Sequence, residues 1–130
     1  MYTTVTTPYG VAVTVEGRPT PEELKVANAT LMDVARTKPG FSLLMDLSKA
    51  HVASDAESQT MISERYGKLF AAGMHRLAIV VSSATVGIQV KRLIAQAVGD
   101  AVISERVRMI DPTVPNWRAD TERWLAEKTP

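Results

Sequence analysis

Two mostly apolar segments in the middle of the chain constrain its fold more than any other feature. They are residues 41–47 (FSLLMDL) and 76–82 (RLAIVVS), and each leads into a segment of helical length. A short apolar run bounded by polar residues is typical of a strand that is covered on both faces. Alternation of such strands with helices predicts right-handed crossovers and a largely parallel sheet with helices packed on it.

The N-terminus is predicted to form a β-hairpin. Residues 2–7 (YTTVTT) and 11–17 (VAVTVEG) are rich in β-branched residues and alternate in character, and a Pro-Tyr-Gly break at 8–10 separates them. Alternation with a period of two indicates strands that have one buried face. The hairpin would add an antiparallel edge to the sheet.

Two helices are predicted from capping boxes, in which an N-cap side chain and an acid three residues later satisfy each other's backbone amides. Thr20 and Glu23 form the first, with Pro21 at the favoured first helical position. Ser54 and Glu57 form the second, with Ser54 as the N-cap. The first helix is expected to end at residues 38–40 and the second near residue 73.

The rest of the chain predicts two further helices and one strand. A helix follows the 76–82 strand and stops at Gly99, residues 106–110 (RVRMI) form a short strand, and a closing helix carries Trp117 and Trp124 on one side. The fold class is therefore α/β. We expect a single domain over residues 1–130, with a mixed, mostly parallel sheet of about five strands, an N-terminal antiparallel hairpin and four helices.

The composition of the chain excludes several classes of function. The 130 residues suit one domain, and 15 basic against 14 acidic residues leave no broad basic field for nucleic acid. The absence of cysteine excludes disulfides and thiolate chemistry. The first ten residues do not read as a signal peptide, and no apolar run approaches the length of about 20 residues that a membrane span needs. We expect a soluble cytoplasmic protein without a membrane span.

Three motifs resemble the STAS domain of anti-sigma-factor antagonists, and more closely the SpoIIAA-like branch of that superfamily. They are LLMDLSKAHVASDAE at 43–57, HRLAIVVSS at 75–83, and VRMIDP at 107–112 followed by a helix that ends in RWL. Their order covers nearly the whole chain. The resemblance implies a non-catalytic regulatory or protein-interaction module, a homodimer, and a regulatory protein or a small apolar ligand as further partner.

The resemblance also locates a regulatory segment. STAS switch proteins carry an Asp-Ser-Ser-Gly-like sequence, phosphorylated on serine, at the start of the helix after this strand, and by position it falls on Ser54, Asp55 and Ala56. Here the Asp-Ser order is reversed, and the second serine and the glycine are missing. The switch motif is therefore not intact, and we expect a partner to dock on the loop and helix that begin at Ser54.

The segment after the 41–47 strand holds the first candidate site. The strand is expected to stop at Asp46, and a short loop would then carry Ser48, His51, Ser54 and Asp55. These residues could form a nucleophile, base and orienter in a hydrolase-like enzyme, or a phosphoacceptor, or simple helix capping by Ser54. All of them lie in one loop, and no Gly-x-Ser-x-Gly elbow exists in the chain, so capping is favoured over catalysis.

A second candidate site follows the 76–82 strand. Ser82, Ser83 and Thr85 accompany the exposed amides of a helix N-terminus, and Asp111 follows the next strand. In open α/β sheets, ligands bind beyond the carboxyl ends of the strands. These residues could form the mouth of an anion or ligand site, and the alternative is capping by Ser83 or Thr85.

A third candidate is an apolar pocket between helix and sheet, lined by Met61, Tyr66, Phe70 and Met74. Such a pocket would make the protein a carrier of a small apolar or amphipathic ligand. A stripe of methionine and aromatic residues at helical spacing is more often core. Gly67, within the same helix, indicates either close packing against another element or a partner subunit, or equally a harmless surface position.

No metal site or cofactor is expected. The two histidines, His51 and His75, lie on different loops without further ligands at zinc spacing. The favoured hypothesis is a non-catalytic interaction module. The carrier is the alternative, and an enzyme that uses the 46–51 loop is the third.

Overall fold

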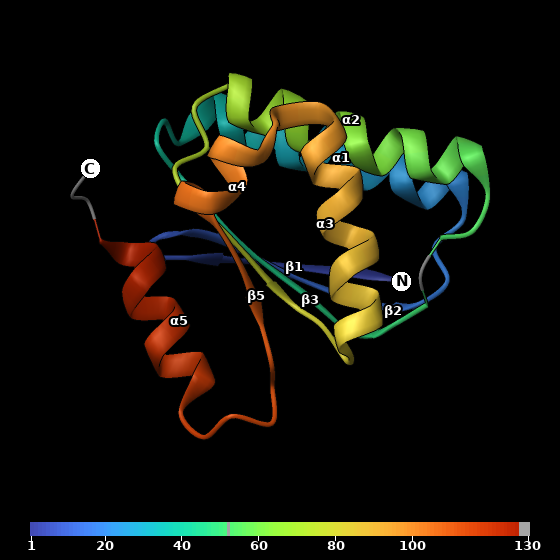
Figure 1. Cartoon of the computed structure of the whole chain (residues 1–130). Helices are drawn as coiled ribbons and strands as arrows, with labels where there is room; N and C mark the ends of the chain where they lie inside the picture. Colours follow the sequence, from blue (N-terminus) through green and yellow to red (C-terminus); the bar gives the residue numbers. More distant parts are fainter. Residues whose placement is uncertain (52, 128–130) are drawn as a thin grey trace.

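The structure is a computed structural model that describes residues 1–51 and 53–127, and a five-stranded sheet forms its centre (Figure 1). The strands lie side by side in chain order, with the first pair antiparallel and the other pairs parallel. This confirms the predicted α/β class, hairpin and mixed sheet. The strands are β1 (Tyr2–Thr7), β2 (Gly10–Gly17), β3 (Ser42–Ala50), β4 (Leu77–Val80) and β5 (Val107–Ile110).

The described residues contain five helices, so the prediction of four was wrong. The additional helix, α4, begins directly after Gly99, whose φ of 84° ends the preceding helix and turns the chain. Ile103 of α4 is buried in the core, and this anchors a seven-residue helix whose sequence has little periodicity of its own. The helices are α1 (Pro21–Thr37), α2 (Ala56–Ala71), α3 (Ala84–Val98), α4 (Asp100–Arg106) and α5 (Trp117–Ala126).

The helices form two unequal layers on the sheet. Helices α1 to α4 cover one face, and α5 alone lies on the other (Figure 1). The connections between successive parallel strands all pass over the same face because each crossover has the same hand. The alternation of side chains along each strand then divides the buried residues into two cores.

The larger core lies between the sheet and α1 to α4, and the smaller one under α5. Val11, Val13 and Val15 of β2 enter the larger core, as their alternation predicts. In β3, Leu43 and Met45 face the same way, whereas Leu44 faces Trp124 and Leu125 in the smaller core.

The first predicted capping box is confirmed and the second is wrong by one residue. Thr20 Oγ1 accepts a hydrogen bond from Glu23 N at 3.2 Å, and Glu23 Oε1 accepts one from Thr20 N at 3.1 Å. At α2 the N-cap is Asp55, whose carboxylate accepts from Ser58 N at 2.8 Å, and Ser54 lies before the helix. A carboxylate makes a stronger, charge-assisted bond at the positive end of a helix than a hydroxyl does.

Strand β3 is longer than predicted. It does not stop at Asp46 but continues to Ala50, because β2 extends past a register shift and pairs Glu16 with Lys49 and Gly17 with Ala50. Asp46 is instead the last β3 residue paired with β4, opposite Val80. Ser48 therefore lies in a strand and not in a loop.

None of the described helices combines the length and the apolar character that crossing a membrane requires.

Candidate functional site

The polar residues of the 46–55 segment fall into two groups on opposite faces of the sheet. Leu47 packs against the larger core, so its neighbours Asp46 and Ser48 point to the α5 side of the sheet. Asp46 Oδ1 accepts hydrogen bonds from Ser48 N at 2.9 Å and from Ser48 Oγ at 2.6 Å. This pair is a local contact within one strand.

His51 and Asp55 lie on the helix side instead. Both line a small cavity of about 60 Å³ that also involves Leu24 and Tyr66. Asp55 is engaged with the backbone of Ser58, and this hydrogen bond is the largest cause that lowers the pKa of its carboxyl. The His51 side chain is exposed and makes no hydrogen bond with any described residue. The segment therefore does not bring Ser48, His51 and Asp55 together.

The second candidate group is brought together in part. Ser82, Ser83 and Asp111 line a hollow of about 400 Å³ at the carboxyl ends of β4 and β5, and Thr85 is not among its lining residues. Ser83 is the N-cap of α3, as one alternative predicts, and its Oγ accepts from Val86 N at 3.2 Å.

Asp111 is also engaged locally. Its Oδ1 accepts from Thr113 N at 2.9 Å and from Thr113 Oγ1 at 2.7 Å, and these bonds lower the pKa of the carboxyl. The same hollow holds Lys91, which the sequence argument missed. Lys91 follows Gly87 by four residues on α3 and so lies on the helix face that borders the hollow.

The four residues of the predicted apolar pocket lie in different surroundings. Tyr66 and Met74 are buried in the larger core, with 1% and 0% of their surface exposed. Phe70 is half-buried and packs against that core. Met61 is half-buried and lines a groove on the outside of the molecule.

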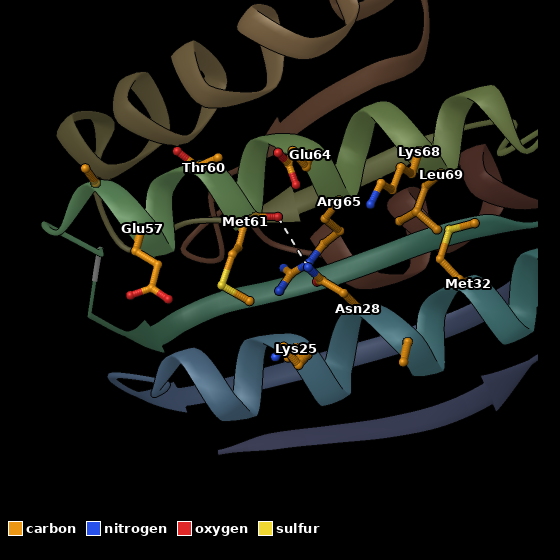
Figure 2. Close-up of a pocket in the computed structure, with 12 residues that line it drawn as sticks. Lys25, Asn28, Met32, Glu57, Thr60, Met61, Glu64, Arg65, Lys68 and Leu69 are labelled. Carbon is orange, nitrogen blue, oxygen red and sulfur yellow. Dashed lines mark hydrogen bonds between the residues drawn. The ribbon is translucent and has the colours of Figure 1, made fainter.

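That groove, of about 660 Å³, runs between α1 and α2 (Figure 2). Helix α1 contributes Lys25, Asn28 and Met32 to it, and α2 contributes Met61, Glu64, Arg65, Lys68 and Leu69 among others. In Figure 2, Arg65 extends from α2 toward Asn28 on α1, between the two helices. The dashed line there marks the hydrogen bond that Asn28 Nδ2 donates to the Met61 carbonyl at 3.3 Å.

Arg65 is the most unusual residue of the groove because only 4% of its surface is exposed. Its Nε donates to Asn28 Oδ1 at 2.5 Å, and its Nη2 donates to the Tyr2 hydroxyl at 2.8 Å. The guanidinium carbon lies 5.5 Å from the centre of the Tyr2 ring and 5.7 Å from that of Tyr66. Among the described residues, no carboxylate lies within the 4.0 Å of an ion pair.

The guanidinium is nonetheless charged. Burial works against the charged form, but an arginine side chain is not deprotonated in proteins. Burial raises the pKa of the Tyr66 hydroxyl, which stays neutral. Arg65 is therefore a buried cation among neutral groups.

The position of Arg65 follows from the spacing of the buried residues along α2, although Arg65 belongs to none of the sequence motifs. The buried stripe of α2 includes Tyr66 and Leu69, and Arg65 lies four residues before Leu69 and four after Met61. Residues four apart in a helix share one face, so a charge here had to fall at the edge of the buried stripe.

No protein-family profile matches the chain, and no curated protein sequence matches it with significance.

Proposed function

We propose that the chain is a non-catalytic, cytoplasmic interaction module of the SpoIIAA-like kind that pairs with a second copy of itself through the edge of strand β1. The observation that carries this proposal is an edge strand with its backbone groups available for pairing and without the features that normally protect such an edge. The resemblance adds that a regulatory protein would dock near the start of α2.

The hydrogen bonds at the start of β1 show which backbone groups point outward. Met1 and Glu16 exchange two backbone bonds, of 2.9 Å and 2.7 Å. In an antiparallel pair such positions alternate with positions that make no bond across the ladder. The amide and carbonyl groups of Tyr2, Thr4 and Thr6 therefore point away from β2, toward the free edge.

The residues of β1 themselves give this edge none of the usual protection. Strand β1 has six residues, Tyr2–Thr7, and none is charged, proline or glycine. Edge strands usually carry charges, proline or bulges that prevent pairing with another chain. The opposite edge strand, β5, has only four residues and carries Arg108. The contrast supports β1 as the pairing edge.

Exposed apolar side chains accompany the edge. Met1 and Val26 are 60% and 67% exposed, and they line a groove of about 400 Å³ between β1 and α1 together with Tyr2 and Thr4. A strand added to a sheet edge places alternate side chains into such a groove, so its binding would combine backbone hydrogen bonds with apolar burial.

A second copy of the chain fits this edge by symmetry. Suppose that two β1 strands pair antiparallel with Thr4 on the two-fold axis. The outward amide and carbonyl of Tyr2 then meet those of the partner's Thr6, and those of Thr6 meet the partner's Tyr2. Two-fold dimers use one self-complementary surface in this way. Because β1 is uncharged, two copies meet without repulsion between strands.

The small volume of the interior pocket also supports an interaction module rather than a carrier of a small ligand. A pocket between sheet and helices, next to His51 and Tyr66, has a volume of about 60 Å³. Sites that enclose small molecules are commonly 300 Å³ or more. A pocket of this size leaves little room for a carried ligand, and this supports the module.

The test is the oligomeric state of two variants of one residue, measured by size-exclusion chromatography with light scattering and by native mass spectrometry. Thr4→Pro removes an outward amide without breaking a bond to β2, so it should convert a dimer into a folded monomer. Thr4→Val keeps the amide and the β-branched shape, and it should remain a dimer. A monomeric parent protein, or a Thr4→Pro variant that stays dimeric, would refute the β1 interface.

A further inference from the structure

Arg65 leaves a positive charge inside the molecule without a neutralising partner among the described residues. Its two hydrogen bonds go to the neutral oxygens of Asn28 and Tyr2. Removing a charge from water is costly unless an opposite charge or several hydrogen bonds replace the water. An arginine side chain has five N–H donors in a planar fork that suits a carboxylate. An anion supplied from outside would remove most of this cost.

Residue 28 is the one that could have supplied the missing negative charge, and it is a neutral asparagine. Asn28 faces the guanidinium, and an aspartate of the same size there would place a carboxylate against Arg65. The amide instead bridges the two helices, because Nδ2 donates to the Met61 carbonyl while Oδ1 accepts from Arg65. The chain holds the cation in place and leaves it positive.

The groove above Arg65 has the form of a site for an amphipathic anion. Lys25 and Lys68 stand on its rim, and neither makes an ion pair with a described residue. Glu57 and Glu64 also line the groove, so with Arg65 its net charge is +1. The remaining lining includes the half-buried side chains of Met32 and Met61, which offer a flexible apolar surface for a hydrocarbon chain.

We propose that the groove between α1 and α2 binds a small carboxylate that carries an apolar chain. The carboxylate pairs with Arg65 at the floor of the groove, and the chain lies over Met32 and Met61. Lys25 and Lys68 add attraction at the rim. This goes beyond the proposed function and does not depend on it, because the groove lies between two helices and not at the β1 edge.

The competing explanation is that Arg65 only ties α1, α2 and β1 together. The variant Asn28→Asp separates the two explanations. In both cases the new carboxylate neutralises Arg65 but gives up the hydrogen bond from Asn28 Nδ2 to the Met61 carbonyl, so the Tm of the ligand-free protein does not separate the two explanations. Only a true anion site loses ligand affinity through the same change, since the internal carboxylate then neutralises the cation with which the external carboxylate would pair.

The experiment uses octanoate as the probe, with thermal-shift assays and calorimetry on the parent protein and on Asn28→Asp. Octanoate should raise the Tm of the parent protein, and Asn28→Asp should weaken its binding roughly tenfold or more, as expected when a charge-assisted hydrogen bond is lost. Octanol and octylamine serve as matched probes with the same chain and should bind more weakly. Amide chemical shifts should move in α1 and α2.

Three results would overturn the proposal. Octanoate without effect on the parent protein would exclude the site. Equal octanoate affinity in Asn28→Asp would show that binding does not involve Arg65. Equal shifts from octanol would show that only the apolar chain is bound. Arg65→Met supplies a second variant, and if it folds it should bind octanoate no better than octanol.

Discussion

Asp55 decides where α2 begins, and the ionisation of one carboxyl should therefore be visible in the stability of the protein. Its carboxylate accepts the Ser58 amide, which is the largest cause that lowers the pKa of Asp55 from its ordinary value of 3.8. Replacing Asp55 by Ala should lower the Tm by a few degrees at neutral pH, whereas Ser54→Ala should leave it unchanged.

The pH dependence has a definite sign because the folded pKa is depressed. The stabilisation by Asp55 is fully present above the ordinary value of 3.8, and it is lost as the pH falls through the lower folded value. The Tm difference between the parent protein and Asp55→Ala should shrink in that range. Asp55→Asn keeps an oxygen acceptor that does not titrate, so it is the control. A larger effect of Ser54→Ala than of Asp55→Ala would contradict this assignment of the cap.

Single residues also show which features of the structure a local sequence pattern can predict. Capping preferences place Ser54 and Asp55 almost equally well, so the pattern finds the helix start but not which side chain makes the bond. Arg65 is different. Its burial depends on Asn28 and Tyr2, which lie 37 and 63 residues away in the chain, and no local pattern contains those contacts.

At the scale of elements, Gly67 lies at a close contact between α2 and α3. A Cβ atom built on Gly67 would lie 3.2 Å from the Cβ of Ala97, which is tighter than ordinary packing. This confirms the prediction of close packing, against an element of the same chain. Gly67→Val should push the helices apart and cost about 1–3 kcal/mol of unfolding free energy, measured in urea.

The neighbouring Lys68→Val is the matched control for Gly67→Val. It places the same side chain on an exposed position of α2, and it should cost no more than helix propensity, about 0.5 kcal/mol. Equal losses in the two variants would show that propensity, and not the contact with Ala97, sets the cost.

The elements that follow from sequence are those with a strong period. The alternation of β2, the apolar runs of β3 and β4 and the capping box of α1 all appear in the structure as predicted. The end of β3 and the presence of α4 do not follow from such patterns. The polar end of β3 is held by pairing with β2, and α4 is held by the burial of Ile103. Both depend on tertiary contacts.

At the scale of the whole molecule, the sheet separates two cores of very different size. Eighteen buried residues form the core under α1 to α4, and five form the core under α5. Apolar burial is the main stabilising term in a domain, so the two layers should not be equally stable. The face with α5 also leaves most of β1 and β2 uncovered by a helix (Figure 1).

We therefore expect α5 to open before the rest of the molecule. Trp124 attaches α5 to the sheet, and it packs against Arg76 and Arg108, whose guanidinium carbons lie 4.9 Å and 4.2 Å from the centre of its ring. Arg76 also donates to the Trp124 carbonyl at 2.6 Å.

In native-state hydrogen exchange, the amides of α5 should exchange faster than those of β3, β4 and α3. Trp124→Leu should increase exchange in α5 far more than in α3, and Trp117→Leu, at a half-buried site of the same helix, should do so less. Equal exchange rates in α5 and β4 would instead mean that the two cores open as one cooperative unit.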